Sequence, residues 1–132
     1  MSTQRIIIAS GPVIVEDGAV LLNLSGKDPF WKFCGGKTHG LDEGLVECAI
    51  RRAREEMGIG LDVIDDMPYI IHATKQSPEG KFDVILVHFL ARRIGEINPG
   101  VDVGNWAWYH LDKLPEDLAP NIIPVLKHFN FL

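Results

Sequence analysis

The chain has few cysteines, no long hydrophobic run and no excess of positive charge. Cys34 and Cys48 are its 2 cysteines among 132 residues, too few for a disulfide framework. Without a secretion signal, we expect both to be buried, reduced thiols in a cytoplasmic protein. The apolar run Ile6-Ile7-Ile8 follows the first five residues and is too short for a signal peptide or a membrane span.

The net charge of −5 excludes one class of partner. A surface that coats a nucleic acid polymer needs a basic stripe, which this composition does not favour. A small anionic ligand stays compatible if a cation mediates the contact. Hydrophobic residues make up 46% and charged residues 23%, as in ordinary globular proteins. The length predicts one domain over residues 1–132, large enough to bury a core without a structural metal.

Apolar and β-branched runs predict a series of strands with two helices among them. Strands are expected at 6–9, 13–15, 19–24, 30–33, 61–64, 69–74, 82–91 and 106–109. Gly11-Pro12 suggests a break or a bulge between the first two. Glu16-Asp17-Gly18 predicts a hairpin turn, and residues 25–29 a loop. The long run 82–91 is typical of a central strand, and residues 121–129 of a closing helix. The fold class is therefore α/β.

Two signals predict the first helix: the helical spacing of its apolar residues and the capping residues at its two ends. Apolar residues recur at helical spacing and predict one buried face, formed by Val46, Ala49, Ile50, Ala53 and Met57. Gly44 suits the N-cap, with Glu47 three positions on as half of a capping box. Gly58 suits the left-handed position that ends a helix.

Arg52, Glu55 and Glu56 crowd one patch of this helix. We expect this patch to lie away from the apolar stripe and to face solvent or a cleft. Carboxylates in a last turn oppose the helix dipole at a cost of roughly 0.3–1 kcal/mol each. Mg²⁺ gives such acids a role, because it takes one or two carboxylates plus phosphate oxygens and water. The alternative is a solvated charge face, with Arg51 paired to Glu55 and Arg52 to Glu56 at i, i+4.

The segment from Gly36 to Ile59 resembles the Nudix box, G-x5-E-x7-R-E-U-x-E-E-x-G-U, in which U is aliphatic. Glu43, Arg51, Ala53, Glu55, Glu56, Gly58 and Ile59 fall on family positions. Trp31-Lys32-Phe33-Cys34-Gly35-Gly36-Lys37 is similar to the strand and turn before the box. Residues 108–115 are similar to the later W-x-x-L-x-x-L-P segment. The likeness spans nearly the whole chain.

The resemblance implies a Nudix fold, a mixed β-sheet sandwiched between α-helices. It also implies a hydrolase of the MutT-like kind, dependent on Mg²⁺ or Mn²⁺, that cleaves a nucleoside diphosphate linked to another moiety. Glu55 and Glu56 are then the metal ligands and catalytic acids, and Asp102 is a weaker third candidate from a loop. Gly36, Glu43, Arg51 and Gly58 are structural residues of the box, with Glu43 paired to Arg51. A homodimer is common in this family.

The chain departs from the family pattern at three places. Arg52 stands where the family has a glutamate that supplies a metal ligand or the general base. Six residues instead of five separate Gly36 from Glu43, and Cys34 replaces a proline. Arg52 would repel a metal ion unless it turns to solvent or contacts substrate phosphate directly, since guanidinium matches phosphate oxygens. Asp42, Glu43 and Asp102 are then candidates for the base.

Several other residues have two interpretations. His39 and Lys37, in the box loop, either contact substrate phosphate or stay on the surface and shape the loop. His72 and His88 are expected to be structural. Tyr69, Trp106 and Trp108 either stack on a base or pack in the core.

Two functions follow from these observations. The first is a divergent Nudix hydrolase in which Arg52 contacts phosphate or swings away from the metal. The second, motivated by Arg52, is a catalytically silent Nudix domain that binds a nucleotide-like ligand or a protein partner. The substrate, the general base and the number of metal ions are not encoded in the box.

Overall fold

The computed structural model describes residues 5–26 and 28–132. Residues 1–4, where we expect no signal peptide, and Lys27, in the predicted loop, lie outside the described part. The strands are β1 (Arg5–Val13), β2 (Val15–Glu16), β3 (Ala19–Ser25), β4 (Gly36–Lys37), β5 (Gly60–Val63), β6 (Tyr69–Ser77), β7 (Gly80–Ile94) and β8 (Val103–His110). The helices are α1 (Leu45–Met57) and α2 (Ile122–His128).

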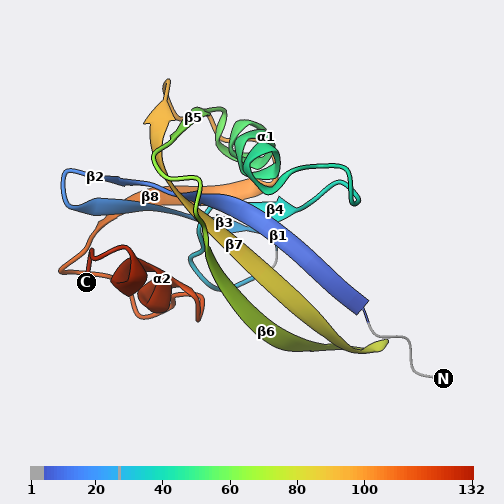
Figure 1. Cartoon of the computed structure of the whole chain (residues 1–132). Coiled ribbons are helices and arrows are strands. Elements are labelled where there is room, and N and C mark those ends of the chain that lie inside the picture. The colour runs from blue at the N-terminus through green and yellow to red at the C-terminus, as the bar shows by residue number, and fades with distance from the viewer. Residues whose placement is uncertain (1–4, 27) are drawn as a thin grey trace.

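Two sheets share the strands. The larger sheet has the order β4-β1-β7-β5, with β6 also on β7, and the smaller has the order β2-β3-β8. Strands β1 and β7 pair in parallel, while the other pairings are antiparallel. Strand β7 pairs with three strands, so its predicted central place is confirmed. The helices α1 and α2 lie on opposite sides of the sheets (Figure 1), which confirms the mixed sheet between helices.

Side chains of the strands point alternately to the two sides of the sheets and fill a core on each side. Val13 and Leu22 belong to the core beneath α2, whereas their neighbours Ile14 and Leu21 belong to the core against α1. Successive side chains of a strand point to opposite faces, so each strand serves both cores. No helix among residues 5–26 and 28–132 is long and apolar enough to cross a membrane.

The predicted break or bulge at Gly11-Pro12 is wrong. Strand β1 runs unbroken to Val13 and pairs with β7 throughout. Strand β4 covers only Ala9 and Ser10 on the other edge. Pro12 therefore lies past the covered part, where that edge has no ladder hydrogen bond to lose.

The segment 30–33 is not an extended strand, because it makes only single bridges, Asn23 to Lys32 and Trp31 to Leu118. These bridges hold the segment between β3 and the loop that leads to α2. The closing helix forms at Ile122–His128, with Asn121 as its N-cap residue, close to the predicted 121–129.

Helix α1 begins after Gly44 and ends at Gly58, which adopts the left-handed conformation with φ 69° as predicted. No cap-residue side chain bonds the N-terminus, because a glycine cap has no side chain. Ala49, Ala53 and Met57 are fully buried as expected, but Ile50 is 36% exposed. The buried face of the helix therefore includes Cys48, which is fully buried, in place of Ile50.

The shift of the buried face changes the position of Glu56. At about 100° per residue, Glu56 lies about 20° from Ala49 around the helix. It is therefore within the buried face and packs against the loop at Gly35. The expectation that this patch lies away from the apolar stripe holds for Glu55, which is exposed, and is wrong for Glu56.

Candidate functional site

Arg51 holds the loop before α1. Its Nε lies 2.6 Å from Glu43 Oε2, and its Nη2 donates to Glu43 Oε1 at 2.9 Å. The same Oε1 accepts from the backbone N–H of His39 at 2.8 Å. The Arg51 guanidinium and the His39 N–H lower the pKa of Glu43 to about 2. The ionised Glu43 carboxylate therefore links the loop to the helix. Its low pKa leaves it poorly suited to act as a base at neutral pH.

Arg52 lies against the backbone of β4. Its Nε and Nη2 donate to the Lys37 carbonyl at 3.2 and 2.9 Å, and Arg51 Nη2 donates to the same oxygen at 3.1 Å. A Cβ on Gly36 would stand 2.7 Å from Arg52 Nε. Glycine at position 36 therefore makes room for the Arg52 side chain, which is bound to the protein and does not swing into solvent.

Glu55 is the carboxylate that pairs with both of these arginines. It accepts from Arg51 Nη1 at 2.9 and 3.1 Å, and its Oε2 is 3.6 Å from Arg52 Nη1. Its side chain is 47% exposed. The i, i+4 pair of Arg51 with Glu55 is present as predicted. Within the described residues, the ion pair recorded for Arg52 is with Glu55 and not with Glu56.

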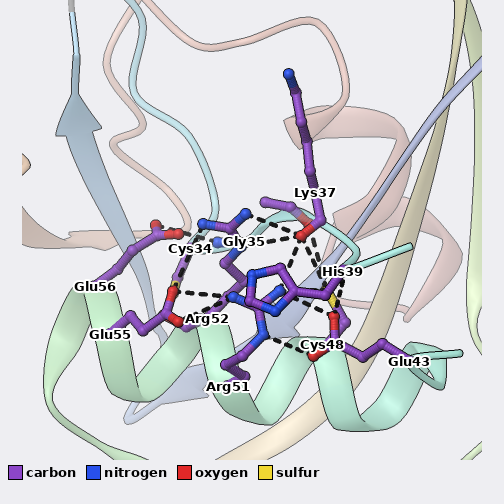
Figure 2. Close-up of polar contacts among 11 residues, drawn as sticks. Cys34, Gly35, Lys37, His39, Glu43, Cys48, Arg51, Arg52, Glu55 and Glu56 are labelled. Carbon is purple, nitrogen blue, oxygen red and sulfur yellow. Dashed lines mark hydrogen bonds and ion pairs between the residues drawn. The ribbon is translucent and has the colours of Figure 1, made fainter. Parts of the chain in front are cut away.

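Glu56 points toward the loop before β4 (Figure 2). Its Oε1 accepts from the Gly35 N–H at 3.4 Å. Burial raises the pKa of the Glu56 carboxyl, although the Gly35 N–H and the cations Arg52 and Lys32 act in the opposite direction. Glu56 thus combines a destabilised negative charge with a weak hydrogen bond, so a cation nearby would stabilise its ionised form.

The loop before β4 lies so close to the backbone of β1 that this contact positions the Gly35 N–H. Gly35 has φ 147°, in a region that favours glycine, and a Cβ there would lie 2.8 Å from the Ser10 carbonyl oxygen. A Cβ on Gly11 would collide with the carbonyl of Cys34. Two glycines therefore let the loop before β4 lie directly on β1.

The charged residues line a first cavity of about 300 Å³. Its walls are Ser25, Gly26, Asp28, Lys32, Gly35, Arg52, Glu55, Glu56 and Asp102. Asp102 reaches the cavity from the loop before β8, which is tied to α1 by a hydrogen bond from the Gly100 N–H to the Glu56 carbonyl at 2.8 Å. The cavity therefore collects residues from four separate parts of the chain.

A second, larger cavity of about 590 Å³ adjoins the first. Ser25, Asp28, Lys32 and Gly35 line both. The second cavity also has aromatic and aliphatic walls, among them Phe30, Phe33, Tyr69 and Ile71, with His88 and Asn121 as polar members. An anionic head in the first cavity and a flat apolar group in the second would fit this pair of spaces.

Comparison with known proteins identifies the architecture. The family model described as the NUDIX domain matches residues 5–129. The chain belongs to the Nudix family. No curated protein sequence matches it significantly.

Solved Nudix structures share the fold. A MutT NUDIX hydrolase from Burkholderia pseudomallei is 24% identical with a TM-score of 0.76, over 93% of this chain and 97% of that one. An ADP-ribose pyrophosphatase from Streptococcus suis is 22% identical with a TM-score of 0.67, over 92% and 87%. A UDP-X diphosphatase is 15% identical with a TM-score of 0.69, over 97% and 64%. At such identities the likeness shows the fold alone.

The donor set of this Nudix domain suits a metal ion that substrate completes, not an all-protein cage. No group of three or more His, Cys, Asp or Glu side chains in the described part of the chain is arranged to hold an ion. Glu55, Glu56 and Asp102 do share one cavity. Mg²⁺ needs only one or two carboxylates when phosphate and water supply the remaining oxygens. These three acids could supply them, and Asp28, which pairs with Lys32, lines the same cavity.

The predicted site residues fall into two groups. Arg52, Glu55, Glu56 and Asp102 meet at the first cavity. Lys37 and His39 are absent from the lining of both cavities, and the Lys37 side chain points away from the cluster (Figure 2). Their contacts in the cluster are instead made by backbone groups, the Lys37 carbonyl and the His39 N–H.

Lys32 was not among the residues selected from the sequence. It lines both cavities and forms an ion pair with Asp28 at 2.9 Å. A lysine just before the Phe33-Cys34-Gly35-Gly36 turn was the available signal, since this turn leads the chain into the box. His88 and Asn121 gave no such signal, because loops and strands far apart in the sequence bring them together.

Proposed function

We propose that the chain is a hydrolase, dependent on Mg²⁺ or Mn²⁺, that cleaves a nucleoside diphosphate linked to another moiety. The observation that carries the proposal is the pair of adjoining cavities, charged and apolar, with Lys32 and Asp28 at their junction. The diphosphate would lie at the charged cavity and the attached flat group in the apolar one. Two structural neighbours bear the names ADP-ribose pyrophosphatase and UDP-X diphosphatase, which agrees with this substrate class.

Glu55 and Glu56 would hold the metal, with Asp102 as the third donor. A bound divalent ion neutralises phosphate charge and lowers the pKa of a coordinated water. Glu56 is the better ligand of the two, because its contact with the Gly35 N–H is long, 3.4 Å, whereas Glu55 pairs with Arg51 at 2.9 Å. To bind the metal ion, Glu55 would have to give up part of its contact with Arg51 or use oxygen lone pairs that Arg51 does not occupy.

The cations would hold the diphosphate. Arg52 donates from Nε and Nη2 to the Lys37 carbonyl, and its Nη1, 3.6 Å from Glu55 Oε2, would be the guanidinium nitrogen that meets a phosphate oxygen. Lys32 would exchange Asp28 for a phosphate oxygen, as a compact point charge on a flexible stem. Lys32→Gln should therefore raise KM more than it lowers kcat. Lys113→Gln, an exposed lysine beyond β8, is the matched control.

Hydrolysis across a panel of nucleoside diphosphate sugars, ADP-ribose and nucleoside triphosphates tests the proposal directly. Product release with Mg²⁺ or Mn²⁺, followed by ³¹P NMR, should appear for one of these classes. Glu56→Gln should reduce the rate by at least about 100-fold, in the range seen when a single catalytic group is removed. Absence of product across the panel with both metals would remove the proposal.

The Glu56→Gln variant can be separated from a folding defect. Glutamine has the shape of a protonated glutamate and still accepts from the Gly35 N–H, and burial already disfavours the charge at this position. Its melting temperature should therefore match or exceed that of the wild type. Glu47→Gln, at an exposed glutamate of the first helical turn, should leave the rate unchanged and lower stability by no more than about 1 kcal/mol.

A second function, a silent domain that binds a nucleotide-like ligand or a protein partner, has one observation in its favour. Glu55 is already neutralised by Arg51 and lies beside Arg52, so it offers a metal less charge than a free carboxylate. Ligand-dependent stabilisation without turnover would support this function. Turnover that Glu56→Gln abolishes would exclude it.

A further inference from the structure

The two lysines of the β6–β7 hairpin lie on opposite faces of the larger sheet. Lys81 pairs with Gln76, the residue that follows Lys75 on β6. Paired residues on neighbouring strands share a face, whereas successive residues of one strand do not. Lys75 accordingly lines the second cavity, and Lys81 lines neither cavity. The hairpin therefore gives the cavity one cation and leaves an equivalent cation on the other side of the sheet.

Lys75 ends one wall of the second cavity. Four alternate residues of β6 line this cavity: Tyr69, Ile71, Ala73 and Lys75. At about 3.4 Å per residue, Lys75 lies about 20 Å along the strand from Tyr69. It is thus close to the end of β6 that points away from α2 (Figure 1). The apolar wall formed by β6 leads to an ammonium group at this end.

Asp28 connects Lys75 with Lys32 electrostatically. Asp28 Oδ2 lies 2.9 Å from Lys32 Nζ, and the Asp28 side chain is 62% exposed. The hydrogen bond and the charge of Lys32 lower the pKa of the Asp28 carboxyl, and the charge of Lys75 adds to this effect. Within residues 5–26 and 28–132, the Lys75 ammonium has no hydrogen bond or ion pair of its own. Asp28 therefore balances part of the charge of both lysines.

The two cavities differ in the sign of their charge. The first has four carboxyl groups against one lysine and one arginine. In the described lining of the second, Lys32 and Lys75 stand against a single carboxyl group, that of Asp28. His88 adds no charge at pH 7, because burial lowers its pKa. The side of α1 therefore attracts a cation, whereas the side of β6 attracts an anion.

We propose that Lys75 is a substrate-binding residue, which forms with Lys32 an anion subsite whose counter-ion in the free protein is Asp28. A phosphate group displaces the Asp28 carboxylate from the two lysines. Lys32 borders both cavities, so one phosphate stays near the metal ligands and the other reaches Lys75. Ammonium groups suit this exchange, because each is a compact charge with three donors on a flexible stem. This inference rests on the proposed function, because it places one phosphate of the same diphosphate.

The probe for this subsite is inorganic pyrophosphate without metal, measured by calorimetry at low ionic strength. Pyrophosphate has no organic group, so its affinity reports contacts to phosphate alone. Lys75→Gln should weaken binding by about fivefold, the size of one charge contact in water. Lys81→Gln removes the same charge from the opposite face of the same hairpin and should leave the affinity unchanged. Both lysines are exposed, so both variants should melt at the wild-type temperature.

A double-mutant cycle tests whether Asp28 and Lys75 act at one subsite. Asp28→Asn keeps the side-chain shape but removes the internal anion, so pyrophosphate should bind about fivefold more tightly. In the Lys75→Gln background the same substitution should gain only about twofold, because Lys32 is then the one lysine released. In the Lys81→Gln background the full gain should remain.

NMR of wild-type protein with ¹³C-labelled lysine gives a readout that needs no variant to fold. Addition of pyrophosphate should shift the Cε resonances of Lys32 and Lys75 and leave that of Lys81 in place. The resonances are assigned from the spectra of the glutamine variants.

Three results would overturn the inference: no measurable binding of pyrophosphate to the wild type, equal losses in Lys75→Gln and Lys81→Gln, or effects of Asp28→Asn and Lys75→Gln that simply add. The expected cycle without hydrolysis of any diphosphate would sustain the subsite and remove the proposed hydrolysis alone. Hydrolysis that depends on Glu56 while pyrophosphate binding is indifferent to Lys75 would do the reverse.

Discussion

Replacing Arg52 by glutamine and by glutamate separates the two effects of this residue on a metal ion. Both variants remove the guanidinium charge next to Glu55, whose Oε2 lies 3.6 Å from Arg52 Nη1. The glutamate variant also adds a carboxylate. We expect the affinity for Mn²⁺ to rise in the order wild type, Arg52→Gln, Arg52→Glu.

The magnitude follows from Coulomb's law, with the dielectric constant of water taken as the case that gives the weakest interaction. Two unit charges about 4 Å apart interact by about 1 kcal/mol in water and about 4 kcal/mol at an effective dielectric of 20. Glu55 is half exposed, so the value in water is the appropriate starting point. A divalent ion doubles it to about 2 kcal/mol, which corresponds to roughly 30-fold in Kd. The glutamate variant should gain about the same factor again.

The substitutions also remove the two hydrogen bonds from Arg52 to the Lys37 carbonyl. Arg51 still donates to that oxygen at 3.1 Å, so the carbonyl keeps a partner and the loss should stay near 1–2 kcal/mol. A urea titration measures this loss separately from the calorimetric Kd for Mn²⁺. Arg54→Gln, at an exposed arginine in the last turn of the same helix, is the control. A Kd for Mn²⁺ within twofold of wild type in both Arg52 variants would show that residue 52 does not influence the metal.

Further predictions concern stability. Gly11→Ala should lower Tm by about 5 °C or more in calorimetry, because its Cβ would collide with the Cys34 carbonyl and overpacking costs about 1–3 kcal/mol. Gly104→Ala, whose Cβ would meet the Leu24 carbonyl oxygen at an ordinary 3.7 Å, should change Tm by no more than about 2 °C. On acidification, the lowered pKa of His88 predicts that stability falls below about pH 6.5, because the unfolded ring binds a proton first. The contribution of Glu43, whose pKa is about 2, should be present above pH 4.5 and be lost as the pH falls toward 2. Unfolding midpoints that stay flat from pH 7 to pH 3 would contradict both.

The helix and its caps could be predicted from the sequence because their signals are local. The αL conformation of Gly58 and the pairing of Arg51 with Glu55 depend on spacing along one helix. Which side of the helix is buried was harder to predict from the sequence. Ile50 is apolar but lies at the edge of that face, whereas Glu56 is charged but lies within it. The loop at Gly35, which contacts Glu56, cannot be placed from helical period alone.

The cavities could not be predicted because distant segments build them. Asp102 lies in a loop that the Asn98 and Gly100 N–H groups hold to α1, and Asn121 meets His88 across 33 positions of sequence. The position of Arg52 was open for a similar reason, because its partner is a backbone carbonyl and not a side chain. Side-chain identity at position 37 gives no information about that contact.

The charges of the first cavity bear on the choice between the two proposed functions. Four carboxyl groups, those of Asp28, Glu55, Glu56 and Asp102, face two cations, Lys32 and Arg52, so the lining has a net charge of −2 when every group is ionised. A diphosphate that entered alone would meet this negative charge. Lys32 and Arg52 are already counted in this net charge, so neither of them offsets it. A single divalent cation brings the lining to neutrality and favours the ionised form of Glu56, whose pKa is raised by burial. In the proposed hydrolysis, the diphosphate would therefore arrive together with a metal ion, and Arg52 would adjust the affinity for that ion without replacing it.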